Sequence, residues 1–106
     1  MSKITLTYNK KEYILEYSRQ SLRMMESQGF AADELAKQPV TMIPLLFQGA
    51  FSKNHKGLKR AVIEEIYDNI ADKGALITAL VEMYSDTVTT IIGDKEEGKA
   101  SWAVSQ

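Results

Sequence analysis

Few side chains in this chain could take part in catalysis, and His55 is the first to consider. It is the only histidine, and it follows Ser52, Lys53 and Asn54 in a polar segment. A histidine can act as a general base near neutral pH. No serine or threonine, however, lies in the pattern of a nucleophile elbow. We therefore favour an exposed histidine at the end of a helix, stabilised by the helix dipole, and keep a small hydrolase only as an alternative.

Acidic side chains recur at intervals of four residues at Glu64, Asp68 and Asp72. On a helix they would share one face and could bind a divalent cation. No histidine lies near them, and the oxygen spacing of a calcium loop is missing. Because Arg60 is placed to pair with Glu64, we favour a solvated helix face. The glycines form no phosphate-binding loop, so we expect neither a metal nor another cofactor.

Basic side chains gather near His55, at Lys53, Lys56, Lys59 and Arg60. They could contact nucleic acid. The cluster lacks the interleaved aromatic residues of single-strand binders, and no helix-turn-helix pattern accompanies it. We favour a solvated loop, and a small regulator that binds nucleic acid through this cluster stays the alternative function.

Composition limits the class of protein. The chain has 106 residues, of which 44% are hydrophobic and 25% charged, which suits one globular domain with a modest core. Its net charge of -1 gives no general attraction to nucleic acid or anionic membranes. It has no cysteine, which excludes disulfides and thiolate chemistry and fits an intracellular protein.

Targeting signals are not evident in the sequence. The N-terminus lacks the basic start and apolar centre of a signal peptide. No uninterrupted apolar stretch reaches the roughly 18 residues that a membrane-spanning helix needs. We therefore expect a cytoplasmic protein that does not bind membranes.

The N-terminal residues alternate between apolar and polar side chains. Residues 3–8 and 12–17 each show this period of two, and Asn9, Lys10 and Lys11 lie between them. The pattern predicts a β-hairpin. Asn9 can adopt the left-handed conformation of a tight turn, although its usual glycine partner is missing, and this leaves the turn type open. Because a lone hairpin is marginal in water, it must pack on helices.

Four helices are predicted after the hairpin. The first has Ser18 as its N-cap, runs to about residue 28, and has Gly29 as the left-handed residue that ends it, with Phe30 packing back on Met25. The others are expected at residues 41–54, with Thr41 as N-cap and Pro44 in the first turn, at 58–72 and at 75–92. The predicted fold is thus α-dominated α+β, a hairpin packed on about four helices in one domain of residues 1–93. Residues 94–106 are predicted to form a disordered, flexible tail.

The segment at residues 41–51 is apolar on nearly all sides, which a surface helix usually is not. Such a helix is either enclosed by its own domain or available to another protein. We consider a packed core the stronger explanation for Leu46, Phe47 and Phe51. The candidates for contact with a partner, or for self-association, are Met42, Ile43, Leu45, Phe47, Phe51, Met83 and Trp102.

The order of these pieces resembles a known family. The resemblance rests on Ile-Thr-Leu-Thr-Tyr-Asn at residues 4–9 with Glu12-Tyr13, Met-Glu-Ser-Gln-Gly-Phe at 25–30, Lys-Gln-Pro at 37–39, Leu-Phe-Gln-Gly-Ala-Phe at 46–51 with His55, and Leu-Val-Glu-Met-Tyr at 80–84. In these features the chain is similar to the small tail assembly chaperones of long-tailed bacteriophages and prophages, particularly of Gram-positive hosts. The similarity covers roughly residues 4 to 92, and the Asn9-Lys10 turn departs from the expected Asn-Gly.

The resemblance implies a protein without catalytic activity. Members of that family bind the tape measure protein, a long and largely helical chain, and keep it soluble while tail tube subunits polymerise around it. They are absent from the mature virion. The expected partners are therefore the tape measure protein, tail tube subunits and further copies of the chain itself.

A programmed ribosomal frameshift makes a longer form in many of these phages. Gly98-Lys99 could be encoded by a slippery run of guanines and adenines. We hypothesise that the frame shifts there, so that residues 100–106 belong only to the short form. The codons of the gene test this hypothesis.

Overall fold

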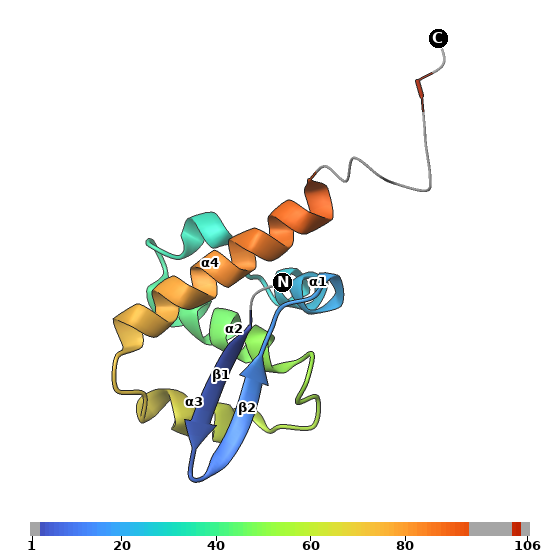
Figure 1. Ribbon diagram of the computed structural model, residues 1–106. Coiled ribbons are helices and arrows are strands. Elements are labelled where there is room, and N and C mark those ends of the chain that lie inside the picture. Colours follow the sequence, from blue (N-terminus) through green and yellow to red (C-terminus); the bar gives the residue numbers. More distant parts are fainter. Residues whose placement is uncertain (1–2, 94–102, 105–106) are drawn as a thin grey trace.

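An antiparallel hairpin packed on four α-helices forms the fold of the computed structural model, which describes residues 3–93 and 103–104. The predicted α+β class is thereby confirmed for this part of the chain (Figure 1). The predicted tail lies outside the described residues, apart from positions 103 and 104. The elements, with a short 3-10 helix η1, are β1 (Ile4–Tyr8), β2 (Lys11–Leu15), α1 (Arg19–Ser27), η1 (Ala32–Glu34), α2 (Pro39–Phe51), α3 (Arg60–Asp68) and α4 (Lys73–Ile92).

The hairpin closes with a two-residue turn between the paired residues Tyr8 and Lys11. Asn9 has φ 50° and Lys10 has φ 64°, and two successive left-handed residues define a type I′ turn. This turn type matches the right-handed twist of the strands. The turn that the sequence left open is therefore the usual hairpin turn, with a lysine where glycine is common.

Local interactions define both ends of helix α1, through side chains at its start and through the backbone at its end. The Ser18 hydroxyl accepts from Ser21 N at 3.1 Å, and Ser21 Oγ accepts from Ser18 N at 2.7 Å, which forms a capping box. At the other end Gly29 has φ 98°, and Phe30 N donates to the Met25 carbonyl at 2.9 Å. The predicted N-cap and left-handed glycine are both confirmed, and the end of α1 is a Schellman motif.

Helix α2 begins earlier than the sequence indicated, and the prediction of Thr41 as its N-cap is wrong. Gln38 is the N-cap and Pro39 is the first helical residue. A proline suits that position, because its fixed φ is helical and its missing N–H would have no partner there. Pro44 consequently lies inside the helix rather than in its first turn. The Val40 carbonyl therefore lacks the donor that another residue at position 44 would supply.

The third helix is shorter than the predicted residues 58–72, because α3 ends at Asp68. Asp72 does not continue it. Instead its carboxylate accepts from Ala75 N at 3.1 Å and forms the N-cap of α4, which begins at Lys73. Helix α4 continues to Ile92 in spite of its β-branched residues. Within it the Thr87 hydroxyl donates to the Met83 carbonyl at 2.9 Å.

The core gathers around α2, which packs against α1, α3, α4 and β2. Tyr17 is buried, and its hydroxyl donates to the Leu46 carbonyl at 2.6 Å, so the chain after the hairpin is bound directly to α2. A Cβ at Gly49 would lie 2.5 Å from Met25 Cγ, so a larger residue there would force the buried Met25 side chain to move. The buried apolar side chains are Leu6, Tyr13, Leu15, Tyr17, Leu22, Met25, Phe30, Met42, Leu46, Phe47, Ala50, Phe51, Ile63, Ile66, Leu80 and Met83.

Helix α4 is long and apolar enough to span a membrane by length and composition alone. It has 20 residues, a mean hydropathy of 1.3, and 17% of its apolar window buried. A core helix can pass the same test. Here Glu82 and Asp86 interrupt the apolar sequence, and Leu80 and Met83 pack into the core.

Candidate functional site: an apolar groove between α2 and α3

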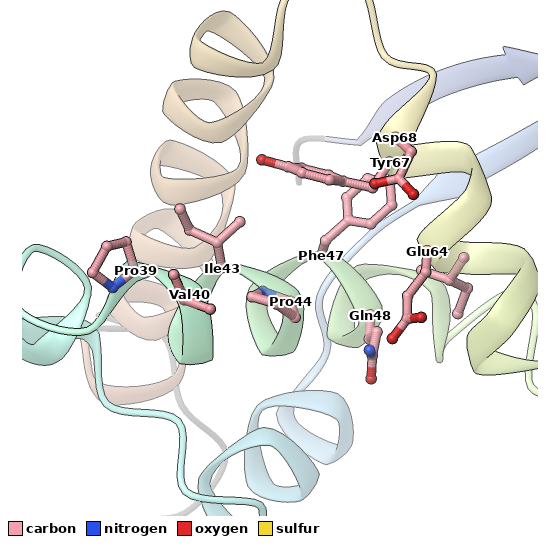
Figure 2. Close-up of a pocket in the computed structure, with 10 residues that line it drawn as sticks. Pro39, Val40, Ile43, Pro44, Phe47, Gln48, Glu64, Tyr67 and Asp68 are labelled. Carbon is pink, nitrogen blue, oxygen red and sulfur yellow. The ribbon is translucent and has the colours of Figure 1, made fainter.

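A groove of about 420 Å³ opens between α2 and α3 (Figure 2). Its volume lies within the range of small-molecule and peptide pockets. Proline, aliphatic and aromatic side chains make most of its surface, and polar groups come from one glutamine and two carboxylates. The lining residues are Pro39, Val40, Ile43, Pro44, Phe47, Gln48, Ile63, Glu64, Tyr67 and Asp68.

The floor of the groove is anchored in the core. Phe47 of α2 and Ile63 of α3 are both buried, and the ring of Tyr67 stands edge-on to Phe47 with 5.3 Å between the centroids. Figure 2 shows the Tyr67 ring extending from α3 over Phe47. These contacts pack α2 and α3 against each other, so the base of the groove is formed by core side chains.

The α2 wall of the groove exposes apolar side chains to solvent. Val40 is 88% exposed, Pro39 and Pro44 are exposed, and Ile43 is partly exposed. A single exposed aliphatic residue is ordinary, but these four follow one another along the same groove. They offer a partner a continuous apolar surface.

Two carboxylates stand on the α3 rim of the groove. Glu64 and Asp68 are exposed and lie one helical turn apart. Within the described part of the chain neither carboxylate makes an ion pair or a side-chain hydrogen bond. The nearby Lys73 ammonium instead donates to the carbonyls of Asp68 at 3.4 Å and Ile70 at 3.3 Å and lies 5.5 Å from the Tyr67 ring centroid. The groove is thus apolar at its base and acidic along one edge.

The candidate partner-binding residues fall into four groups. Ile43 and Phe47 line the groove. Leu45 is partly buried against the core, while Met42, Phe51 and Met83 are buried within it. The surface of this fold therefore does not offer these last three side chains to a partner. Trp102 lies outside the described residues.

His55 lies beyond the end of α2 and fastens the following loop to β2. Its Nε2 accepts from Ile14 N at 2.9 Å, so the ring proton lies on Nδ1 in this arrangement. The ring packs 5.2 Å from that of Tyr13 and 6.2 Å from that of Phe51. The predicted exposed histidine at a helix end is corrected to a partly buried side chain that pairs a backbone N–H of an edge strand.

The basic cluster is divided by the fold. Lys53 Nζ pairs with Glu16 Oε2 at 3.0 Å, while Lys56, Lys59 and Arg60 remain exposed. Hydrogen bonds from Asn54 first and from Lys53 second hold the pKa of the Glu16 carboxyl below its ordinary value. One of the basic groups that could have met a phosphate is therefore occupied by Glu16.

The acidic row of the sequence is also divided. Glu64 and Asp68 share a face of α3, but Asp72 lies beyond that helix and caps α4. Among the described residues no group of three or more acidic, histidine or cysteine side chains is arranged to hold a metal ion.

The chain matches a known protein family. A family model described as a domain of unknown function, DUF5055, matches residues 1–106. The chain belongs to this family. No curated protein and no solved structure matches the chain.

The sequence did not indicate the groove of this DUF5055 member as a site. Val40 precedes the predicted N-cap Thr41, so it fell outside the expected helix. Ile63 and Tyr67 lie within the third helix that the sequence predicted, but the contact of Tyr67 with Phe47 of α2 is a tertiary one. The sequence shows only that Pro39 and Pro44 lie beside Val40 and Ile43, and the structure is needed to show that Val40 is exposed and Ile43 partly exposed.

Proposed function

We propose that this protein is a tail assembly chaperone of a long-tailed phage or prophage, which binds the tape measure protein through the α2–α3 groove without catalysis. The groove is the observation that carries the proposal, because it presents apolar side chains that the fold itself leaves uncovered. The order of sequence features that resembles those chaperones supports the identity of the client.

A chaperone for a long helical chain must cover apolar surface and later release it. Each large apolar side chain that enters a groove contributes roughly 1.5–3 kcal/mol when fully buried. A groove that accepts only a few such side chains binds the client weakly enough for tube polymerisation to release it. The base of the groove, formed by Phe47, Ile63 and Tyr67, is packed within the chain itself, and the groove is present without the client.

The proposal includes a cytoplasmic site of action and departure before the virion matures. Tail tube subunits are proposed as a second class of partner, and self-association as a third. In this scheme the exposed polar faces keep the complex of chaperone and client soluble while the tube grows.

The direct test is co-expression with the tape measure protein that the proposal predicts to be encoded beside this gene. We expect the client to be soluble with the chaperone and to precipitate without it. Ile43→Glu places a charge in the groove, and we expect it to return most of the client to the pellet. Ser85→Glu adds the same charge at an exposed position of α4 and is the matched control.

Both variants must keep the circular dichroism of the parent protein for the comparison to hold. Equal precipitation of the client with and without the chaperone would refute the proposed function. Loss of solubilisation by Ser85→Glu but not by Ile43→Glu would move the client site from the groove to α4.

A further inference from the structure

We propose that the α2–α3 groove takes a helical partner segment whose apolar face fills the groove while a lysine or arginine of that segment meets Glu64 and Asp68. This inference rests on the proposed function and specifies the chemistry of the client segment. It follows from three properties of the groove: its walls, its acidic rim and the absence of a basic partner for that rim within the described chain.

The walls favour a helix over an extended segment. Both sides of the groove are helices, whose backbone groups are largely paired internally. An extended peptide would find no strand edge there, and most of its N–H and C=O groups would lose water over an apolar floor without gaining partners. A helix satisfies its own backbone and can present side chains at i, i+3, i+4 and i+7 to the groove.

The rim defines the charge of the occupant. Glu64 and Asp68 stand on consecutive turns of α3, on the edge where an incoming helix would lie. Bringing an apolar helix beside them removes part of their water, which is unfavourable unless a cation replaces it. A lysine or arginine next to the apolar face of the segment supplies that cation, and an acidic residue there would be repelled.

A second copy of the chain fits this groove less well. A symmetric dimer through the groove would place the same surface on both sides. The residues that line the groove include no lysine or arginine, so the groove of a second copy would bring no cation to Glu64 and Asp68. The acidic rim therefore favours a different, basic chain as the occupant.

The test uses the purified full-length chain and labelled designed peptides of about 18 residues, long enough to form several helical turns. One peptide carries leucines at helical spacing with lysines beside them. A second replaces those lysines with glutamates, and a third keeps the lysines but has a central proline that breaks the helix. Binding is measured by fluorescence anisotropy at low ionic strength.

We expect the lysine peptide to bind at least about threefold tighter than the glutamate peptide, and tighter than the proline peptide. The double variant E64K/D68K changes only exposed side chains, and we expect it to reverse the order of the lysine and glutamate peptides. Ile43→Glu should weaken the lysine peptide by about tenfold, and Ser85→Glu should leave its binding unchanged.

Equal binding of the lysine and glutamate peptides, or the same order after E64K/D68K, overturns the inference. Binding of the proline peptide as tight as that of the lysine peptide overturns its helical part. Conversion of a dimer to a monomer by Ile43→Glu, seen by light scattering, would identify a second copy as the occupant and also overturn it.

The failure of this inference can be separated from that of the proposed function. If Ile43→Glu abolishes client solubilisation while E64K/D68K does not affect it, the chaperone role stands and the basic helix does not. If the client is never solubilised, the role itself fails, whatever the peptides do.

Discussion

Lys10 occupies a backbone conformation that lysine rarely adopts. Its φ of 64° places it in the left-handed region, as the second residue of the type I′ turn. For a residue with a Cβ this conformation costs roughly 1–2 kcal/mol. Glycine avoids most of this cost, but it also increases the conformational entropy of the unfolded chain, which offsets part of the gain. The turn forms because the strands on both sides pair, and the strain at Lys10 remains.

Substitution of this residue should therefore stabilise the protein. We expect Lys10→Gly to raise the free energy of unfolding by about 0.5–1 kcal/mol, measured by urea denaturation. The control is Lys11→Gly, because Lys11 is a paired strand residue where glycine should lower stability by a similar amount. A decrease with Lys10→Gly would show that the lysine side chain contributes more than its backbone costs.

The structural roles of several residues could be predicted from the sequence because these roles depend on neighbouring residues. Ser18 and Gly29 work through groups within a few residues of themselves, so their roles as helix ends were predicted. His55 was predicted less well. Its hydrogen-bond partner Ile14 lies 41 positions away in the sequence, and a local sequence pattern does not predict so distant a partner.

The loop between α2 and α3 acts as a cover for the outer edge of β2. Asn54 Nδ2 donates to the Ile14 carbonyl at 3.2 Å and to Glu16 Oε1 at 3.0 Å, while His55 accepts from Ile14 N. A strand edge with unpaired backbone groups invites pairing with other chains. Side chains of this loop therefore do for Ile14 what a third strand would do.

The Glu16 carboxylate makes this cover dependent on pH. Hydrogen bonds from Asn54 and Lys53 hold its pKa below the ordinary value of 4.5. A lowered folded-state pKa contributes stability that is present above 4.5 and is lost as the pH falls through the folded-state value. We expect Glu16→Gln to be less stable than the parent near neutral pH.

The difference between the two proteins should shrink in acid. Thermal unfolding followed across this pH range checks the prediction, and comparing the two proteins isolates the carboxyl from other titrating groups. A difference that stays constant from neutral pH to well below 4.5 would mean that packing, rather than charge, makes Glu16 useful.

The element boundaries show where sequence patterns stop being informative. Thr41, Pro39 and Gln38 are all acceptable near a helix start, and only the packing of α2 decides among them. Asp72 could continue one helix or cap the next, and its bond to Ala75 N selects the cap. Alternation did predict the hairpin, because it reports which face of a strand is buried, and the capping residues Ser18 and Gly29 predicted the first helix.

At the scale of the whole molecule, the groove is a product of helix pairing. The sequence predicted a helix in both places and an apolar surface on nearly all sides of residues 41–51, but not which parts would pack together and which would stay uncovered. Val40 remains exposed and Ile43 partly exposed because α3 covers α2 only as far as Phe47 and Tyr67 meet. Met42 and Phe51 of the same helix are buried instead. The sequence alone does not show which apolar residues of α2 are buried and which are exposed.

The hairpin and the helices are joined through α2, so they should unfold together. Leu46 is fully buried at the centre of α2, and its carbonyl accepts the hydrogen bond of Tyr17. Burial raises the pKa of the Tyr17 hydroxyl, which therefore remains a donor throughout the ordinary pH range. The hairpin also contacts α3, where the Tyr8 hydroxyl donates to Glu65 at 2.9 Å.

Truncation of Leu46 should consequently destabilise every part of the fold by the same amount. We expect Leu46→Ala to lower the free energy of unfolding by about 3 kcal/mol, whereas the partly buried Leu45→Ala should lower it by about 1 kcal/mol. Far-ultraviolet circular dichroism follows the helices, and near-ultraviolet circular dichroism follows the packed tyrosines. The urea midpoints of the two signals should shift together, because α2 supports both the helices and the packed tyrosines. If the tyrosine signal kept its midpoint while the helices unfolded at lower urea, the hairpin and the helices would be separate folding units.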